Sequence, residues 1–160
     1  MHILAIDPGA KGALVLVDAN TGLLVACHDM PTMEVRVNGK MKTRVDAAKL
    51  ARIIESMWID RAILEKVGAM PEQGVTSMFA FGRTVGLVEG VLAAMNHEPH
   101  WVLPQEWRKL AKAAGDKTSS RQRAALLFPE SAHLFKRVKD DGRADAACMA
   151  YAGIRLFDAL

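Results

Sequence analysis

The chain has 160 residues, of which 51% are hydrophobic and 24% are charged, and its formal net charge is +3. A chain of this length fits one domain, and its apolar content is enough to fill a core, which excludes an intrinsically disordered protein. We therefore expect a single domain over residues 1–160. The mildly positive charge is compatible with a nucleic-acid partner without identifying one.

Cysteine usage and the N-terminal segment indicate the compartment. Cys27 and Cys148 lie in separate apolar runs, so we expect reduced core thiols rather than a disulfide framework or a zinc site. The first residues enter a strand without a basic segment and a long apolar run, and no stretch approaches a membrane span. These features predict a soluble, cytoplasmic protein with no membrane partner.

The N-terminal third predicts an antiparallel meander followed by a hairpin. Residues 2–7, 12–18 and 22–30 are typical of strands separated by short turns. Asn38-Gly39 lies between two alternating runs in residues 33–45, which is a strong signal for a small β-hairpin. The polar side of this hairpin is basic and carries Arg36, Lys40, Lys42 and Arg44.

Helices and strands alternate through the rest of the chain. Asp46 is a predicted N-cap for a helix over residues 47–58, residues 61–65 predict a short buried strand, and residues 100–103 predict a fifth strand. Further helices are expected at 104–113, 117–128 and 143–157. This order predicts an α/β domain in which helices cover a mixed sheet.

A long apolar helix is predicted after Pro71. Gly82, Gly86 and Gly90 recur four residues apart within it. Because each glycine weakens a helix unless packing compensates, we expect this stripe to pack closely on the sheet.

Acidic residues stand at the ends of three apolar elements: Asp7, Glu65 and Asp145, the last of which follows Asp141 by four residues. Each has an ordinary structural interpretation, as a turn residue, a solvated strand end or a helix-start acid. Together they predict a shared divalent-metal site, because converging carboxylates need a cation. Two ions about 4 Å apart would activate water and stabilise the leaving oxygen of a phosphodiester displacement.

Six basic residues and one acid, Asp116, lie between residues 108 and 123. Such a run is often only a solvated helical face, but beside an acidic metal site it predicts contacts with phosphates flanking the cut. The basic residues are Arg108, Lys109, Lys112, Lys117, Arg121 and Arg123. Trp101 and Trp107 are expected to be packing residues, with stacking on an unpaired base as the alternative.

The segments ILAIDPGAKGALVLVD and DDGRADAACMAYAG, with Glu65 between them, resemble the RuvC family of Holliday-junction resolvases over almost the whole chain. The resemblance implies an RNase H-like (retroviral integrase-like) fold, a mixed five-stranded sheet flanked by helices, with the basic hairpin as a small insertion. It implies catalytic metal ligands at Asp7, Glu65, Asp145 and Asp141, with Asp140 as the alternative to Asp141. Lys117 matches a lysine near the scissile phosphate.

The same resemblance implies cofactor, partner and substrate. We expect two Mg²⁺ ions in each site, with Mn²⁺ as a substitute, and a homodimer that cuts four-way or branched DNA with water as the nucleophile, in a bacterial or phage-infected cell. The apolar helix over residues 73–95 is the candidate dimer interface, and Met70 or Phe79 is the candidate strand-separating wedge. The predicted DNA-binding residues are Arg108, Lys109, Lys112, Lys117, Arg121, Arg36, Lys40 and Lys42.

Two other functions remain open at this point. One is a nuclease of the same fold that processes structured RNA, similar to the YqgF proteins. The other is an actin-like or sugar-kinase-type nucleotide-binding domain, which also uses an Asp-x-Gly hairpin. Its superfold duplicates the domain, whereas this chain has neither a second such hairpin nor a Gly-rich phosphate loop.

Overall fold

Five strands form one mixed sheet in the order β3-β2-β1-β6-β7. Strands β1 (His2–Ile6), β2 (Ala13–Asp18) and β3 (Leu23–Asp29) form the predicted antiparallel meander. Strands β6 (Arg61–Glu65) and β7 (Pro99–Val102) run parallel to β1. The computed structural model describes residues 1–68 and 74–158, apart from the side chain of Lys117.

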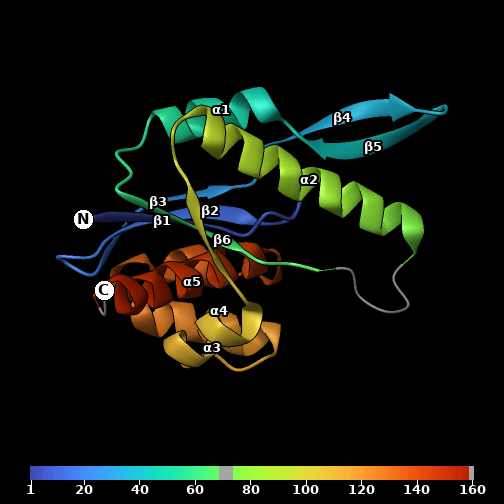
Figure 1. Cartoon of the computed structure of the whole chain (residues 1–160). Helices are drawn as coiled ribbons and strands as arrows, with labels where there is room; N and C mark the ends of the chain where they lie inside the picture. Colours follow the sequence, from blue (N-terminus) through green and yellow to red (C-terminus); the bar gives the residue numbers. More distant parts are fainter. Residues whose placement is uncertain (69–73, 159–160) are drawn as a thin grey trace.

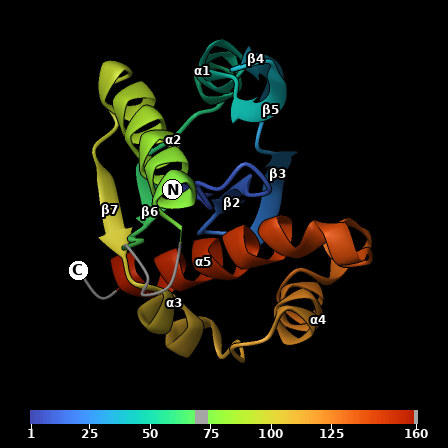
Figure 2. The same cartoon turned by 90° about the vertical axis from the view of Figure 1, so that its right-hand side faces the viewer.

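Helices cover both faces of this sheet (Figure 1). Helices α1 (Ala47–Glu55) and α2 (Val75–Ala94) lie on one face, and α3 (Pro104–Ala111), α4 (Lys117–Leu127) and α5 (Asp141–Phe157) lie on the other, as Figure 2 shows end-on. This three-layer arrangement confirms the predicted α/β class.

The central strand β1 is buried on both faces, which explains its unbroken apolar sequence. Ile3 and Ala5 pack into the core beneath α5, and Leu4 and Ile6 pack into the core beneath α1 and α2. All four side chains are fully buried. The alternation of a strand thus divides the apolar residues between two cores.

Helix α5 lies close against the sheet because its inner face is built from small residues. Alanines fill most of that face, and a Cβ placed on Gly153 would stand 2.4 Å from Ile63 Cδ1. At the start of α5, a Cβ on Gly142 would stand 2.2 Å from the carbonyl oxygen of Lys11. The helix therefore touches the β1–β2 turn directly.

The predicted hairpin forms a separate two-stranded sheet. Strands β4 (Thr32–Val37) and β5 (Lys40–Val45) are joined at Asn38 and Gly39, whose φ angles are 50° and 77°. These positive angles are those of the hairpin turn that an Asn-Gly pair favours. The hairpin extends beyond the five-stranded sheet (Figure 1).

The predicted element bounds agree closely with the structure. Asp46 caps α1 by accepting a hydrogen bond from the Lys49 backbone amide at 3.0 Å, as predicted. Helix α5 begins at Asp141, two residues before the predicted start at Arg143. Two short 3₁₀ helices, η1 (Pro129–Phe135) and η2 (Val138–Asp140), were not predicted.

The predicted packing role of the glycines in α2 is wrong. Gly82, Gly86 and Gly90 are exposed, and a Cβ built on any of them would meet nothing within 4 Å. The residues of α2 that are buried against the sheet are Val88 and Leu92. The glycine stripe therefore faces away from the sheet.

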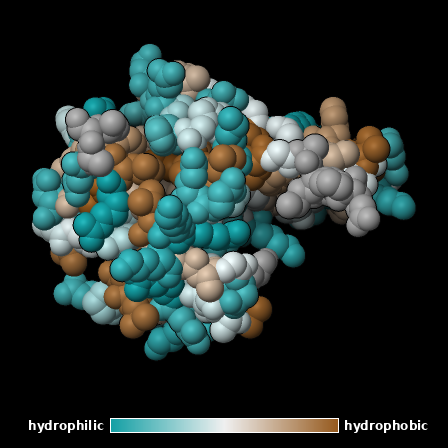
Figure 3. All heavy atoms as spheres, turned by 60° about the horizontal axis from the view of Figure 1, so that its bottom comes forward, coloured by the Kyte–Doolittle hydropathy of each residue, from teal (hydrophilic) through white to brown (hydrophobic). Residues whose placement is uncertain are grey.

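Helix α2 is also the one segment, within the described ranges 1–68 and 74–158, that is long and apolar enough to cross a membrane, contrary to our expectation of none. Length and composition alone are a weak indication of a membrane span. The helix packs instead against α1 and the sheet core. Apolar surface is visible on the part of the molecule that projects to the right in Figure 3.

Replacing Gly142 with alanine should destabilise the fold, because the added Cβ would collide with the backbone of Lys11 and Gly12. We expect a loss of about 1–3 kcal/mol in the free energy of unfolding, measured by urea denaturation. Gly90→Ala is the matched control: with open space around it, alanine should stabilise α2 by up to about 1 kcal/mol. Equal effects of the two substitutions would contradict this account of the α5 contact.

Candidate functional site

Two of the predicted site carboxylates lie side by side at one edge of the sheet. In the parallel pairing of β1 with β6, Ile6 lies opposite Leu64. Asp7 directly follows the first of these residues and Glu65 the second. The carboxyl ends of parallel strands are the usual position of sites in open α/β sheets.

The turn after β1 fixes the position of Asp7. Its backbone amide donates to the carbonyl of Ala13 at 3.0 Å, and the Gly9 amide donates to its Oδ1 at 3.3 Å. Gly12 passes so close that an added Cβ would lie 2.1 Å from the Asp7 carbonyl oxygen and 2.9 Å from its Cγ. Gly12 thus lets the chain fold tightly around a half-buried carboxylate.

Asp145 reaches the same region from helix α5. Together with Asp7 it lines a cavity of about 730 Å³, whose wall runs from the β1–β2 turn to the start of α5. The other acidic residues that line this cavity are Asp29, Asp140 and Asp141. The fold therefore gathers five carboxylates around one cavity.

Glu65 lies beside this cavity without forming part of its wall, and it is held by a tryptophan. The Trp107 indole Nε1 donates to Glu65 Oε1 at 2.9 Å, and Trp107 is only 1% exposed. Burial raises the pKa of Glu65, the Trp107 hydrogen bond opposes that rise, and the negative charge of Asp145 adds to it. Glu65 and Asp145 are therefore close enough to repel each other.

Trp107 has a role that sequence reasoning missed, since we expected it to pack in the core or to stack on an unpaired base. The residue lies in α3, 42 positions after Glu65, and no local pattern links the two. The one signal available was its place in the helix that directly follows β7, which lies beside β6.

Arg108 also acts on this carboxylate. Its positive charge lowers the pKa of Glu65, and its Cζ lies 5.0 Å from the centre of the Trp107 ring. Its Nε is buried, with no hydrogen-bond partner among the described residues. Arg108 is thus directed into the protein rather than fully exposed as a phosphate-binding arm would be.

The acids at the start of α5 are neutralised by arginines of the same chain. Asp141 forms an ion pair with Arg121. Asp140 is 1% exposed and accepts hydrogen bonds from the Arg137 backbone amide and Nη2, both at 2.8 Å. Arg143 binds Asp29 on β3 through two hydrogen bonds of 2.5 and 2.7 Å. These contacts fasten the α4–α5 connection to the sheet.

Among residues 1–68 and 74–158, no three His, Cys, Asp or Glu side chains are arranged to hold a metal ion. The chemistry of Asp7, Glu65 and Asp145 nevertheless fits one. Hard carboxylate oxygens are the donors that Mg²⁺ and Mn²⁺ take. Burial and, to a smaller extent, the negative charge of Asp145 raise the pKa of Glu65, and a bound cation would oppose both effects. The metal site stays a prediction.

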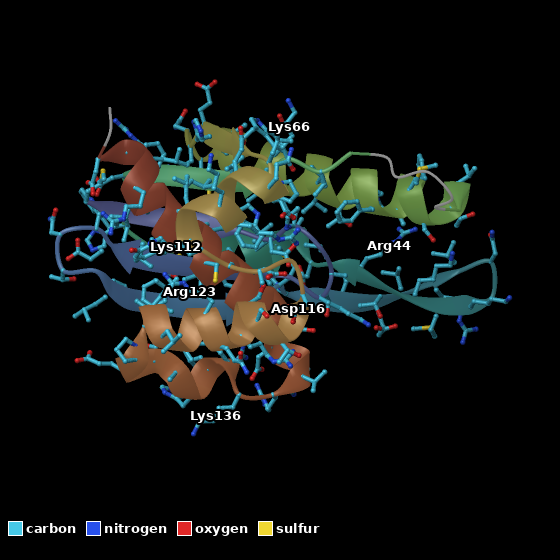
Figure 4. The ribbon with its side chains drawn as sticks, turned by 90° about the horizontal axis from the view of Figure 1, so that it is seen from below. Arg44, Lys66, Lys112, Asp116, Arg123 and Lys136 are labelled. Carbon is cyan, nitrogen blue, oxygen red and sulfur yellow. The ribbon has the colours of Figure 1, made fainter. Side chains whose placement is uncertain are left out.

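The predicted basic run separates into two groups. Lys109 on α3 and Lys112, the residue that caps the C-terminal end of α3, are exposed. Arg123 donates instead to the carbonyl of Ala111 at 2.6 Å, which ties α4 to α3. Figure 4 labels Lys112, just after α3, and Arg123, on α4. Lys117 opens α4, but its side chain, like Met70 and the predicted interface residue Gln73, lies outside what the structure describes.

The strand order, the strand directions and the helices on both faces define an RNase H-like α/β fold. A solved structure of Thermus thermophilus RuvC has this fold: it matches with a TM-score of 0.61 and 14% identity, covering 99% of this chain and 97% of that one. The structure of T. thermophilus RuvC in complex with a Holliday junction substrate matches with a TM-score of 0.58 and 12% identity, covering 98% and 96%. The RuvC-like fold predicted from the motifs is therefore confirmed.

No protein-family model and no curated protein matches the sequence itself. At 12–14% identity the similarity to RuvC establishes the fold, and the chemistry must be argued from the residues of this chain.

Glu65→Gln should raise the melting temperature in metal-free buffer at pH 8. The pKa of Glu65 is higher in the folded state than in the unfolded state. Between these two pKa values the folded state binds more protons than the unfolded state, so the free energy of unfolding falls as the pH rises through this range. At pH 8, above both values, the full cost is present. Glutamine removes that cost and can still accept the Trp107 hydrogen bond. Each 1 kcal/mol gained corresponds to about 2–4 °C.

The gain should shrink below the ordinary pKa of a glutamate, where the wild-type side chain is protonated in both states. Glu55→Gln, at an exposed position near the end of α1, provides the control for loss of one negative charge. A Glu65→Gln protein that melts at or below the wild-type temperature at pH 8 would show that Glu65 is not under electrostatic strain.

Proposed function

We propose that this protein is a divalent-metal-dependent endonuclease that hydrolyses phosphodiester bonds in branched DNA, with the four-way junction as its main substrate. One observation carries the proposal, which is the meeting of three carboxylates from separate elements. Asp7 and Glu65 stand at the carboxyl ends of adjacent parallel strands, and Asp145 of α5 lies close enough to Glu65 to repel its negative charge. The similarity to a RuvC structure bound to a Holliday junction supports the choice of substrate.

Asp7, Glu65 and Asp145 would hold one or two Mg²⁺ or Mn²⁺ ions. When bound, such ions activate a water molecule and stabilise the charge on the leaving oxygen. Within the chain, Trp107 holds one oxygen of Glu65 and leaves the other for a ligand, and Gly9 orients Asp7.

Two further residues have roles that rest on the family resemblance. We keep Asp141 as the proposed fourth ligand, which requires Arg121 to give up part of its ion pair with it. We also keep Lys117 as the residue beside the scissile phosphate.

The DNA would be held by exposed cations on two sides of the carboxylates. Lys109 on α3 and Lys112 just after it form one group, and the hairpin carries the other, Lys40 and Lys42, with the third predicted contact, Arg36, on its opposite face. Arg108 and Arg121 remain proposed contacts, although each already has an internal role. Loss of either should therefore affect the site as well as affinity.

Helix α2 supports the proposed homodimer. At 100° per residue, its exposed glycines share one stripe with Val75 and Phe79. These two side chains are 79% and 75% exposed. The stripe lies opposite Val88 and Leu92, which anchor the helix to the sheet. A continuous apolar stripe of this kind typically marks a protein interface, and glycines allow a second helix to approach closely.

Asp7→Asn should abolish cleavage of a labelled four-way junction while leaving junction binding intact, because it removes ligand charge without changing the size of the side chain. Cleavage would be followed by gel electrophoresis in Mg²⁺, in Mn²⁺ and in EDTA, and binding by a mobility shift in EDTA. Glu65→Gln and Asp145→Asn should behave alike. Near wild-type cleavage by Asp7→Asn would refute the assignment of the site.

The same assay separates the substrate classes. Wild-type protein should cut the four-way junction in preference to a Y-fork, a linear duplex and a structured RNA of equal length. Preferential cleavage of the RNA would instead support the YqgF-like alternative and leave the site assignment standing.

Gly86→Arg should convert a dimer into a monomer, measured by sedimentation velocity, because it places a large charged side chain in the centre of the α2 stripe. In the isolated chain a Cβ at this position would meet nothing within 4 Å. Ala80→Arg, exposed but about 120° away around the helix, is the control and should leave the dimer intact. A monomeric wild type, or a dimeric Gly86→Arg protein, would overturn the proposed interface.

A further inference from the structure

The β4–β5 hairpin is a projecting element with an unequal distribution of charge. Its fourteen residues, 32–45, include four basic side chains and one acid, Glu34. In Figure 1 it extends beyond the central sheet, in the same direction as the N-terminal end of helix α2. A two-stranded hairpin buries little apolar surface of its own. Core packing therefore does not account for the choice of cationic residues on its surface.

The register places the charges on particular faces. Residues opposite each other in the antiparallel pair share a face, and Val37 pairs with Lys40, Val35 with Lys42 and Met33 with Arg44. One face therefore carries a cationic row on β5 beside an apolar row on β4. Arg44, labelled in Figure 4, lies towards the base of the hairpin.

The opposite face differs in charge. Arg36 pairs with Met41, and Glu34 pairs with Thr43, whose hydroxyl donates to Glu34 Oε1 at 2.5 Å. The only acid of the hairpin is thus on the same face as Arg36. The cationic row has no acid on its face.

The cationic row has dimensions that suit a nucleic-acid backbone. Alternate residues of a strand are about 6.8 Å apart, so Lys40, Lys42 and Arg44 extend along about 14 Å. A duplex presents one phosphate per strand for about every 3.4 Å of its axis. A two-stranded ribbon is also narrow enough to enter the major groove, where the apolar row could contact bases or sugars.

The hairpin begins at the wall of the carboxylate cavity. Thr32, the first residue of β4, lines the same cavity as Asp7 and Asp145. Strands of six residues extend about 20 Å from that point. A DNA arm lying along the hairpin would therefore lead directly to the proposed site.

We propose that the β5 row, Lys40, Lys42 and Arg44, holds a duplex arm of the DNA substrate next to the cut, as a binding element separate from the carboxylates. This proposal rests on the proposed function. The row contacts backbone phosphates and so increases affinity without selecting sequence. Arg36, on the other face, contributes little.

The test compares Lys42→Gln with Arg36→Gln, two exposed cations of the same hairpin on opposite faces. Binding to a four-way junction would be measured by fluorescence anisotropy in EDTA over a series of salt concentrations. Lys42→Gln should reduce the log–log salt slope by up to about 0.9, and Arg36→Gln should leave it unchanged. The triple variant at positions 40, 42 and 44 should lose up to about 2.7 in slope.

A second arm of the test locates the contact. Neutral methylphosphonates placed about two to eight base pairs from the branch should weaken wild-type binding, and the triple variant should be insensitive to them. Equal effects of Lys42→Gln and Arg36→Gln, or a triple variant as sensitive to methylphosphonates as the wild type, would overturn the proposal.

These outcomes differ from failure of the proposed function. If the wild type neither binds nor cuts branched DNA, the function is wrong and the hairpin proposal falls with it. If the wild type binds and cuts normally while the triple variant matches it, only the hairpin proposal fails. Unchanged circular dichroism and melting temperature would confirm that each variant is folded.

Discussion

The fold holds carboxylates together at the carboxyl ends of strands β1 and β6, where their like charges repel one another. Glu65 shows the constraint most directly, because both burial and the charge of Asp145 raise its pKa. Its Trp107 hydrogen bond comes from a helix that packs against α5. The close contact of Gly142 with the β1–β2 turn brings the start of α5 to the same edge. Loosening any of these contacts would separate the carboxylates and relieve their repulsion, so packing energy from the two cores must hold them in place.

The acids around the cavity differ in how their charge is balanced. Asp140 and Asp141 lie against arginine side chains, and Asp29 is bound by Arg143. Such pairs of partly buried charges hold one geometry, because breaking one partner leaves the other uncompensated. They are well suited to fix the loop before α5. Glu65 is balanced instead by an indole donor and a nearby guanidinium, which leaves its charge incompletely compensated and makes it the better candidate for a metal ligand.

Much of the fold could be predicted from the sequence, because local signals were consistent with one another. The Asn38-Gly39 turn, the Asp46 cap and the apolar runs each define an element without knowledge of the rest, and the RuvC-like motifs implied a mixed five-stranded sheet. The contacts between distant residues could not be predicted in this way. The Arg121–Asp141 pair and the Trp107–Glu65 bond join positions 20 and 42 residues apart, and neither has a local pattern. The glycines of α2 are a different case, because a stripe at helical spacing appears identical in the sequence whether it faces a sheet or solvent.

The two projecting elements give the proposed nuclease a way to recognise shape rather than sequence. The proposed metal-loaded carboxylates would cut any phosphodiester that reaches them, so selection of branched DNA would have to come from where the backbone is held. The cationic face of the hairpin would fix the direction of one arm relative to the cavity, starting from Thr32 in its wall. Pairing through the exposed α2 stripe would fix the position of a second carboxylate edge relative to the first. A linear duplex could contact the hairpin of one protomer, whereas a junction offers arms to both protomers of the proposed dimer at once. Binding both protomers simultaneously raises the affinity for the junction without any new kind of contact.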